Sequence, residues 1–349
     1  MLYLKKKGLP FKFHGAKDVA DCKTSEEVMI KAGLDWPVGK CEIYAKPPVE
    51  EVDITNLATD GFYHDGDLFT QVPNGYATYR MDNGYPLGIV KERYTPVQNI
   101  DAFKFFDDAI GKNAAIWQTA GLFGGGQRIF VSAKLPDTIS VKGDPVDSYL
   151  VFTNSHDGST GVKILFTPIR VVCENTLNAA IRTSQSYVTF KHTKSVHDNI
   201  STAKEILGIC QVISGKLQET YNFMRSIKVD DRKAKEIIAK TVLTQSDFDK
   251  LKQGGYTHES IFAGNYNAVS FADISTQKYK MLLNMNIYYH EGIGQKEIEG
   301  TAWGVYNAIT GYYSNMENNE GIKRMDTLLY GDRSRKIETI GNLILEEAV

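Results

Sequence analysis

Hydrophobic and polar residues repeat with two different periods along this chain. From about Gly75 to Val172, apolar residues alternate with polar ones or form short runs bounded by glycine, proline or asparagine, as is typical of strands. From Ser195 onward, apolar residues recur every three or four positions, which predicts helices. We therefore expect an α+β fold in which central β-hairpins form an antiparallel sheet with packed helices, followed by a largely α-helical C-terminal half.

Turn and capping residues divide these patterns into elements. Asn83-Gly84, the triple glycine at 124–126 and the HDGSTG segment at 156–161 predict three hairpins, because such residues tolerate the backbone of tight turns. A first helix is predicted from Thr24 to a closing Gly33, and residues 174–184 predict a short one. The long helix that begins at Ser195 is expected to break at Ser214. The predicted units are a small α/β segment and loop (1–60), a β-rich core (61–195) and a helical region (196–349).

Composition excludes several classes of protein. The chain has 349 residues, of which 42% are hydrophobic and 23% charged, with a net charge of −2. A polyanion would therefore need a local site, because the whole molecule has no basic excess. No apolar run approaches the roughly 20 residues that span a bilayer. The four cysteines are scattered without a CxxC pair, which favours a reducing cytoplasm.

Local charge points towards nucleic acid. Residues 161–240 contain 13 lysines and arginines and 7 acidic residues, a difference of +6. Cations along strands and a strand-to-helix junction suit a phosphate backbone, and Tyr187 and Phe190 offer flat faces for bases. A solvated surface is the alternative interpretation. The candidates for phosphate contacts are Arg128, Lys134, Lys163, Arg170, Arg182, Lys191 and Lys194.

A thiol hydrolase is a second possibility. Cys173 with His156 or His192 has the residue types of a nucleophile and its base, and Asn175 could orient them. However, Cys173 follows two valines at a strand end, where a free cysteine is usually a buried core residue.

Metal ligation is not predicted from these residues. His192 and His197 are five positions apart, which does not place two imidazoles on one helical face. We expect no metal and no cofactor.

The HDGSTG segment has a structural explanation as well. Asp157 precedes a glycine, which favours a tight turn whose hydroxyl groups bond to nearby amides. His156 and Asp157 would then shape the hairpin, while Asn175 and Thr176 would shape the start of the following helix.

Several segments together resemble a known family. AGLDWPV, LGIVKERYTPVQN, NSHDGSTG, TPIRVVCENTLNAAI, KHTKSV and GTAWGVYNAITGYY occur in this order. They resemble the phage/plasmid-like Domain of Unknown Function 932 family from about residue 31 to the C-terminus. The resemblance implies a product of a phage, a plasmid or an integrated element, located in the cytoplasm of a bacterial host, and it implies no established reaction.

A second likeness is architectural. Paired hairpins beside a helix, followed by a long helix and a helical tail, are similar to single-strand annealing proteins of the RecT and Red-beta type. That likeness implies a ring or filament of identical subunits with a basic groove for single-stranded DNA.

Three hypotheses about function follow. The chain binds and anneals single-stranded DNA, it is a Cys173-dependent hydrolase, or it binds a host protein, such as a defence enzyme, through its helical half. The first depends on the strand-borne cations forming one continuous track that neighbouring carboxylates do not occupy.

Overall fold

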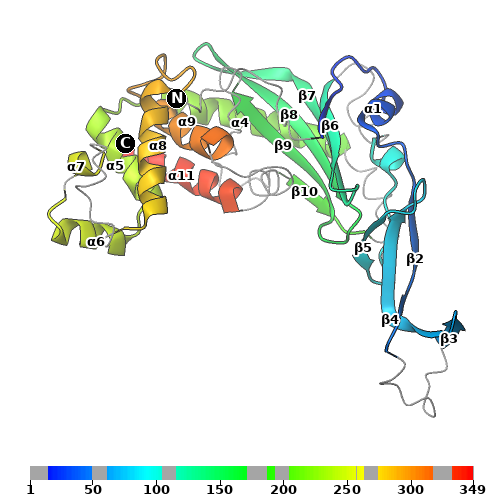
Figure 1. The fold of residues 1–349 in the computed structure, drawn as a ribbon. Helices are drawn as coiled ribbons and strands as arrows, with labels where there is room; N and C mark the ends of the chain where they lie inside the picture. Colours follow the sequence, from blue (N-terminus) through cyan, green and yellow to red (C-terminus); the bar gives the residue numbers. More distant parts are fainter. Residues whose placement is uncertain are drawn as a thin grey trace.

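The structure is a computed structural model that describes residues 15–48, 61–103, 115–170, 187–192, 204–256, 258–262, 274–316 and 332–348. Within these residues the fold is mixed α+β, with antiparallel sheets in the N-terminal half and helices in the C-terminal part, as predicted. Figure 1 shows an elongated molecule in which the main sheet lies between a group of helices and a protruding β-structure.

The main sheet has six strands in the order β1-β6-β7-β8-β9-β10, all paired antiparallel. Residues of β8 and β9 are buried almost without interruption, as expected for central strands that are covered on both faces. The strands are β1 (Lys17–Asp18), β6 (Ile116–Phe123), β7 (Arg128–Val141), β8 (Asp144–Ser155), β9 (Val162–Arg170) and β10 (Tyr187–Phe190).

The second sheet has the order β2-β4-β3, and β5 also pairs with β4. Its strands are β2 (Val38–Ala45), β3 (Gly61–His64), β4 (Asp67–Arg80) and β5 (Pro86–Val90). We call β2, β3 and β4 the β-arm, because Figure 1 shows them extending away from the main sheet. Because β2 pairs with β4, this sheet joins residues on both sides of the predicted boundary at residue 60. The predicted division into three units stays a prediction.

The predicted hairpins are confirmed, and strand β7 of the main sheet is longer than predicted. Strand β7 continues past Pro136, where its register with β8 shifts between Lys134 and Thr138. A proline cannot donate a ladder hydrogen bond, so it is accommodated at such an irregularity. A tight turn at Lys142 and Gly143, both with positive φ, then leads into β8.

Helix α4 (Lys204–Ser226) packs against β7. Gln218 and Asn222 of α4 bond to the backbone of Ser140 and Lys142 at the end of β7. The predicted break at Ser214 is wrong, because α4 continues through this position. Tertiary packing of one helix face outweighs the weak helix preference of serine and of the following glycine.

The helical part follows the predicted periodicity. Trp303 and Tyr306 of α9 (Ala302–Gly311) and Tyr221 of α4 are all buried and form one aromatic cluster. A π-helical turn (Tyr312–Met316) follows α9. The remaining described helices are α1 (Ser25–Ala32), α5 (Asp231–Val242), α6 (Gln245–Gln253), α7 (His258–Phe262), α8 (Thr276–Glu291) and α11 (Asp332–Ala348).

Candidate functional site

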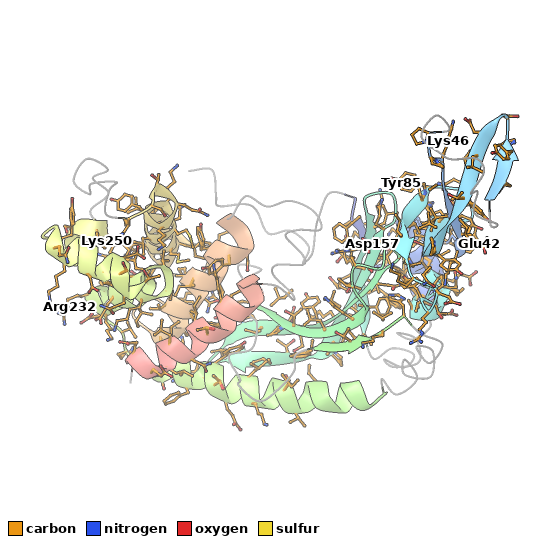
Figure 2. The ribbon with its side chains drawn as sticks, turned by 90° about the horizontal axis from the view of Figure 1, so that it is seen from below. Glu42, Lys46, Tyr85, Asp157, Arg232 and Lys250 are labelled. Atoms are coloured by element: carbon orange, nitrogen blue, oxygen red, sulfur yellow. The ribbon has the colours of Figure 1, made fainter. Side chains whose placement is uncertain are left out.

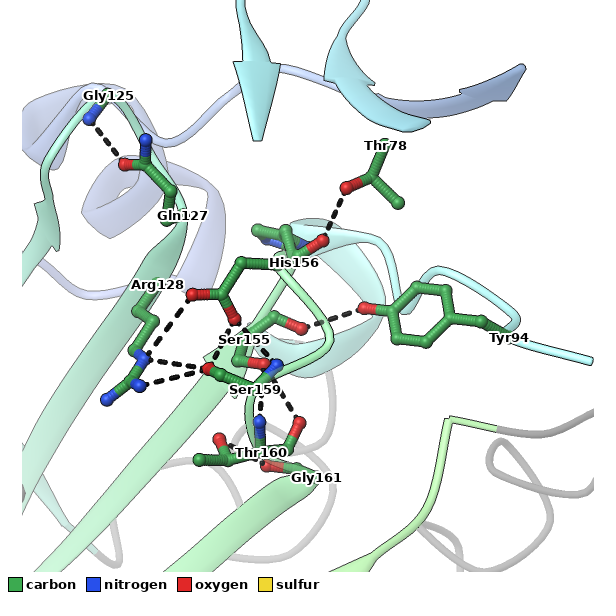
Figure 3. Close-up of polar contacts among 11 residues, drawn as sticks. Thr78, Tyr94, Gly125, Gln127, Arg128, Ser155, His156, Ser159, Thr160 and Gly161 are labelled. Carbon is green, nitrogen blue, oxygen red and sulfur yellow. Dashed lines mark hydrogen bonds and ion pairs between the residues drawn. The ribbon is translucent and has the colours of Figure 1, made fainter. Parts of the chain in front are cut away.

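The turn after β8, residues 154–161, connects the two sheets. Thr78 of β4 donates a hydrogen bond to the carbonyl of His156 at 2.5 Å, and Tyr94 donates one to the carbonyl of Ser155 at 2.8 Å (Figure 3). A Cβ atom on Gly88 of β5 would lie 2.5 Å from the Cα of Asp157, so only glycine allows this approach. We call this contact region the arm joint.

The polar side chains of the turn largely bond to one another. Asp157 accepts from the amide of Ser159 at 2.9 Å and also from its hydroxyl group. The Ser155 hydroxyl donates to the carbonyl of Thr160 at 2.8 Å and accepts from its amide. Asp157 therefore stabilises the turn through its own side chain.

His156 is completely buried in the arm joint. Its Nε2 lies 2.9 Å from Oδ1 of Asn99, and the Asn99 amide donates to the carbonyl of Leu34. Because Oδ1 of Asn99 accepts, Nε2 of His156 carries the proton, and Nδ1 is left as a buried acceptor without a partner. Burial, with the nearby His192, lowers the pKa of His156 to about 3, so the ring is neutral at pH 7.

His192 belongs to the same region. Its ring stacks on Tyr94 with centroids 4.5 Å apart, and neither ring nitrogen has a hydrogen-bond partner. Burial lowers its pKa to about 4 and raises the pKa of the Tyr94 hydroxyl group. Both candidate bases are therefore packed inside the joint. Cys173, Asn175 and Thr176 lie outside the described residues, as does the predicted helix at 174–184, so the hydrolase constellation stays a prediction.

Arg170 has a position that the phosphate hypothesis did not anticipate. Its side chain is 0% exposed, and Nε lies 2.6 Å from Oδ2 of Asp144. The same carboxylate oxygen accepts from the Trp303 indole at 2.8 Å, and Arg170 also donates to the carbonyl of Gly294. The expected phosphate contact of Arg170 is corrected here, because the guanidinium group is enclosed where the sheet meets the helices.

The other described cations do not form a track of unpaired charges. Lys134 is paired with Asp147 at 2.7 Å, and Arg128 bonds to the Ser159 hydroxyl with Asp157 3.8 Å away. Lys163 is half-buried, and Lys191 is exposed at the end of β10. Arg182 and Lys194 lie outside the described residues. Two of the five described cations are ion-paired by Asp144 and Asp147, and a third lies beside Asp157.

Within the described ranges, no group of three or more histidine, cysteine, aspartate or glutamate side chains is placed to hold a metal ion. In the same part of the chain, every helix is too short or too polar to cross a bilayer.

The β-arm has a feature that the sequence analysis missed. Tyr44, Phe62 and Phe69 form a row of rings on one face, with centroids 5.1 Å apart for the first pair and 5.4 Å for the second. Phe62 is 47% exposed, and Tyr63 on the same strand is 55% exposed. Large exposed apolar side chains that gather on one sheet mark an interaction surface rather than a core. We call Tyr44, Phe62 and Phe69 the aromatic row.

A sequence signal for this surface was present. Asp65-Gly66 separates FYH from DLFTQV, and both residues have positive φ in the turn between β3 and β4. This pair is a strong hairpin signal. The strand-rich block was instead expected to begin near Gly75, so the aromatic residues before it were not assigned to a strand.

The fold and these surfaces define an elongated α+β protein with a protruding aromatic β-arm and buried polar contacts at both ends of its central sheet. The model of the family described as "Domain of unknown function (DUF932)" matches residues 86–340, and the chain belongs to this family. No curated protein and no solved structure matches the chain. The architectural likeness to single-strand annealing proteins has no support from these comparisons.

Proposed function

We propose that this protein acts by binding another protein and that the β-arm is the surface it uses. The observation that supports this proposal is the aromatic row, in which Tyr44 and Phe62 are exposed. The sheet that carries it extends from the body of the molecule (Figure 2). Aromatic side chains are enriched in protein interfaces, where they contribute a large contact area at a low entropic cost.

The charge of the arm favours a protein over a nucleic acid. The described residues of this segment, 38–48 and 61–80, contain 3 lysines and arginines and 3 aspartates and glutamates, so their net charge is 3 − 3 = 0. Lys46 is itself paired with Asp67, and the ammonium group of Lys40 lies over the Tyr76 ring and bonds to the carbonyl of Tyr94. Aromatic rings that stack on bases normally occur beside cations that neutralise the phosphates. Here the described cations are matched in number by carboxylates, so the described part of the arm has no basic surplus.

Photocrosslinking tests the proposal directly. A photoreactive phenylalanine analogue replaces Phe62 in one variant and Ile30 in the control, since Ile30 is also exposed but lies on α1. We expect protein crosslinks from position 62 that excess unlabelled wild-type chain suppresses and the Phe62→Thr chain does not. Equal crosslinking from positions 62 and 30, or none from either, would refute the proposal.

Single-stranded DNA is the second candidate, with a smaller set of contacts than predicted. It is supported by the exposed Lys191 and by the +6 balance of residues 161–240. Lys163, Lys191, Arg182 and Lys194 are its remaining candidates. Anisotropy of a labelled oligonucleotide at about 50 mM salt should then show binding that Lys191→Ala weakens. A wild-type chain that does not bind under these conditions excludes this candidate.

A further inference from the structure

Two buried histidines lie where the second sheet contacts the turn after β8. His156 is 0% exposed and His192 is 7% exposed. Nδ1 of His156 and both ring nitrogens of His192 have no hydrogen-bond partner within the described part of the chain. Protonation would enclose a charge and an additional N–H group without an acceptor, and both are costly in a protein interior. The closed arm joint therefore requires both rings to be neutral.

The residues that enclose the two rings belong to segments just before β2 and just after β5. Trp36 meets His156 edge to face with centroids 5.5 Å apart, and Tyr94 stacks on His192. The amide of Thr95 donates to the carbonyl of His192 at 3.1 Å. These segments flank the strands of the second sheet, which include the β-arm. Separation of this sheet from the turn would therefore expose both imidazoles to water.

The neighbouring charges do not compensate for the burial of these rings. Burial lowers the pKa of both rings, and His192 further lowers the pKa of His156. Asp157 raises both pKa values, and the backbone of Thr95 raises the pKa of His192. The effect of burial is the larger one, so both rings are neutral at pH 7 in the closed joint.

The carboxylate of Asp157 is itself engaged by other groups. It accepts from the amide and the hydroxyl group of Ser159 and lies 3.8 Å from Arg128. Arg80 lies over the Trp36 ring, so the aromatic residue that contacts His156 carries a cation on its face. Six other described charges adjoin these segments in sequence and are at least partly exposed, so solvent screens them: Asp35, Lys91, Glu92, Arg93, Asp101 and Lys191.

We propose that His156 and His192 form a pH-sensitive switch that holds the second sheet closed while both rings are neutral and releases the β-arm when they are protonated. Open rings in water bind protons near pH 6.5, so opening becomes easier as the pH falls below this value. The contact between the sheet and the helices involves neither histidine, because Arg170 binds Asp144 at the other end of β8. The switch acts on the position of the arm and is independent of the partner that the arm binds.

Hydrogen exchange of the full chain from about pH 7 to about pH 5 measures the opening. A peptide containing Thr95 reports on the joint, and one containing Ala302 reports on the helices, where its amide donates to the carbonyl of Ile227. Exchange rates are divided by the intrinsic rate at each pH to give the open fraction. Each proton taken up on opening contributes up to about tenfold per pH unit, so the open fraction at Thr95 should rise roughly 50-fold between pH 6 and pH 5.

Substitution of the histidines tests their part in this rise. In His156→Gln or His192→Gln the rise at Thr95 should be less than about tenfold, and in the double variant it should vanish. The matched control is His64→Gln, which removes an exposed histidine of β3 and should leave the rise unchanged. The comparison with Ala302 in the wild-type chain needs no variant, and the open fraction at Thr95 should exceed that at Ala302 by at least about tenfold at each pH.

A distance measurement establishes that the arm moves. Lys46 and Lys250 are exposed and lie at opposite ends of the molecule (Figure 2). Spin labels attached there through non-canonical residues leave the native cysteines unchanged, and double electron–electron resonance gives the distribution of distances between them. We expect a narrow distribution at pH 7 that broadens by about pH 4.5 and narrows again when the pH is restored, while circular dichroism shows that the helices are retained.

Four results would overturn the switch. They are an open fraction at Thr95 that does not rise as the pH falls, and a rise that is unchanged in the double variant. Equal open fractions at Thr95 and Ala302 would mean that the chain unfolds as a whole and that the joint does not open by itself. A distance distribution that stays narrow down to about pH 4.5 would mean that the arm is not released.

Discussion

Replacing Arg170 by methionine distinguishes two roles for this residue. If Arg170 contacted phosphates, its loss would weaken DNA binding and leave the fold intact. In the structure its guanidinium group is fully buried against Asp144, with a further bond to the carbonyl of Gly294. Removing one partner of a buried ion pair leaves the other charge uncompensated in the interior. We therefore expect a loss of stability.

The size of the effect follows from this burial. Breaking a buried pair from one side costs about 3–5 kcal/mol, which is a large part of the roughly 5–15 kcal/mol that stabilises a folded protein. At about 2 °C per kcal/mol for a chain of this length, Tm should fall by roughly 6–10 °C. Asp144 would retain the Trp303 indole as a donor, which limits the loss.

Thermal melting and urea unfolding of Arg170→Met measure this cost. The matched control is Lys191→Met, which removes an exposed cation from the same predicted set and should change stability by less than about 0.5 kcal/mol. Adding Asp144→Asn to Arg170→Met should recover part of the loss, because the uncompensated charge is then absent while an acceptor for Trp303 remains. An Arg170→Met chain that melts within about 1 °C of wild type would refute the buried-pair argument.

Three further predictions concern the arm joint and the helices. Burial lowers the pKa of His156 to about 3 and that of His192 to about 4. Below pH 6.5 the unfolded chain therefore binds more protons than the folded chain. The free energy of unfolding should fall by about 2–3 kcal/mol from pH 6.5 to pH 5. Urea unfolding across this pH range measures this fall. A free energy of unfolding that does not change with pH contradicts the prediction, and so does a pH dependence that is unchanged in the double variant His156→Gln, His192→Gln. Gly88→Ala should destabilise the protein by about 1–3 kcal/mol, because its Cβ would clash with the Asp157 backbone. Gly215→Ala in α4 should stabilise it by about 0.5–1 kcal/mol, because a Cβ there meets open space. Equal denaturation midpoints for these two variants would show that the close approach at Gly88 is not tight. Asp247→Ala should lower the free energy of unfolding by about 1–2 kcal/mol. The Asp247 carboxylate completes the capping box of α6 with Thr244 and binds Lys278 at 2.5 Å. An unchanged urea unfolding curve would mean that the cap contributes nothing to stability.

Periodicity and turn chemistry predicted the classes of element well. The first helix begins after Thr24 and ends at Gly33 as expected, because the cap and the left-handed closing residue are local signals. The hairpin at Asn83-Gly84 is confirmed for the same reason. The predicted break at Ser214 failed, since packing of α4 on β7 is a tertiary effect that a single helix pattern does not contain.

The candidate site was harder to predict than the fold. Charge counts cannot show which cations are buried, and Arg170 looks like any other strand arginine until Asp144, 26 residues earlier, is placed beside it. The neutral state of His156 also depends on distant residues, because Asn99 reaches it from a separate segment. By contrast, the aromatic row was predictable in principle from Asp65-Gly66 and the rings around it. It was missed because the strand pattern was begun too late.

The two buried polar contacts are connected through one strand. Strand β8 begins at Asp144, which binds Arg170 and Trp303, and ends at Ser155, whose carbonyl accepts from Tyr94. Twelve extended residues separate these contacts by roughly 36 Å. Buried polar contacts add little net stability compared with apolar packing, but each requires a defined geometry. Strand β8 therefore fixes the orientation of the β-arm relative to the helices.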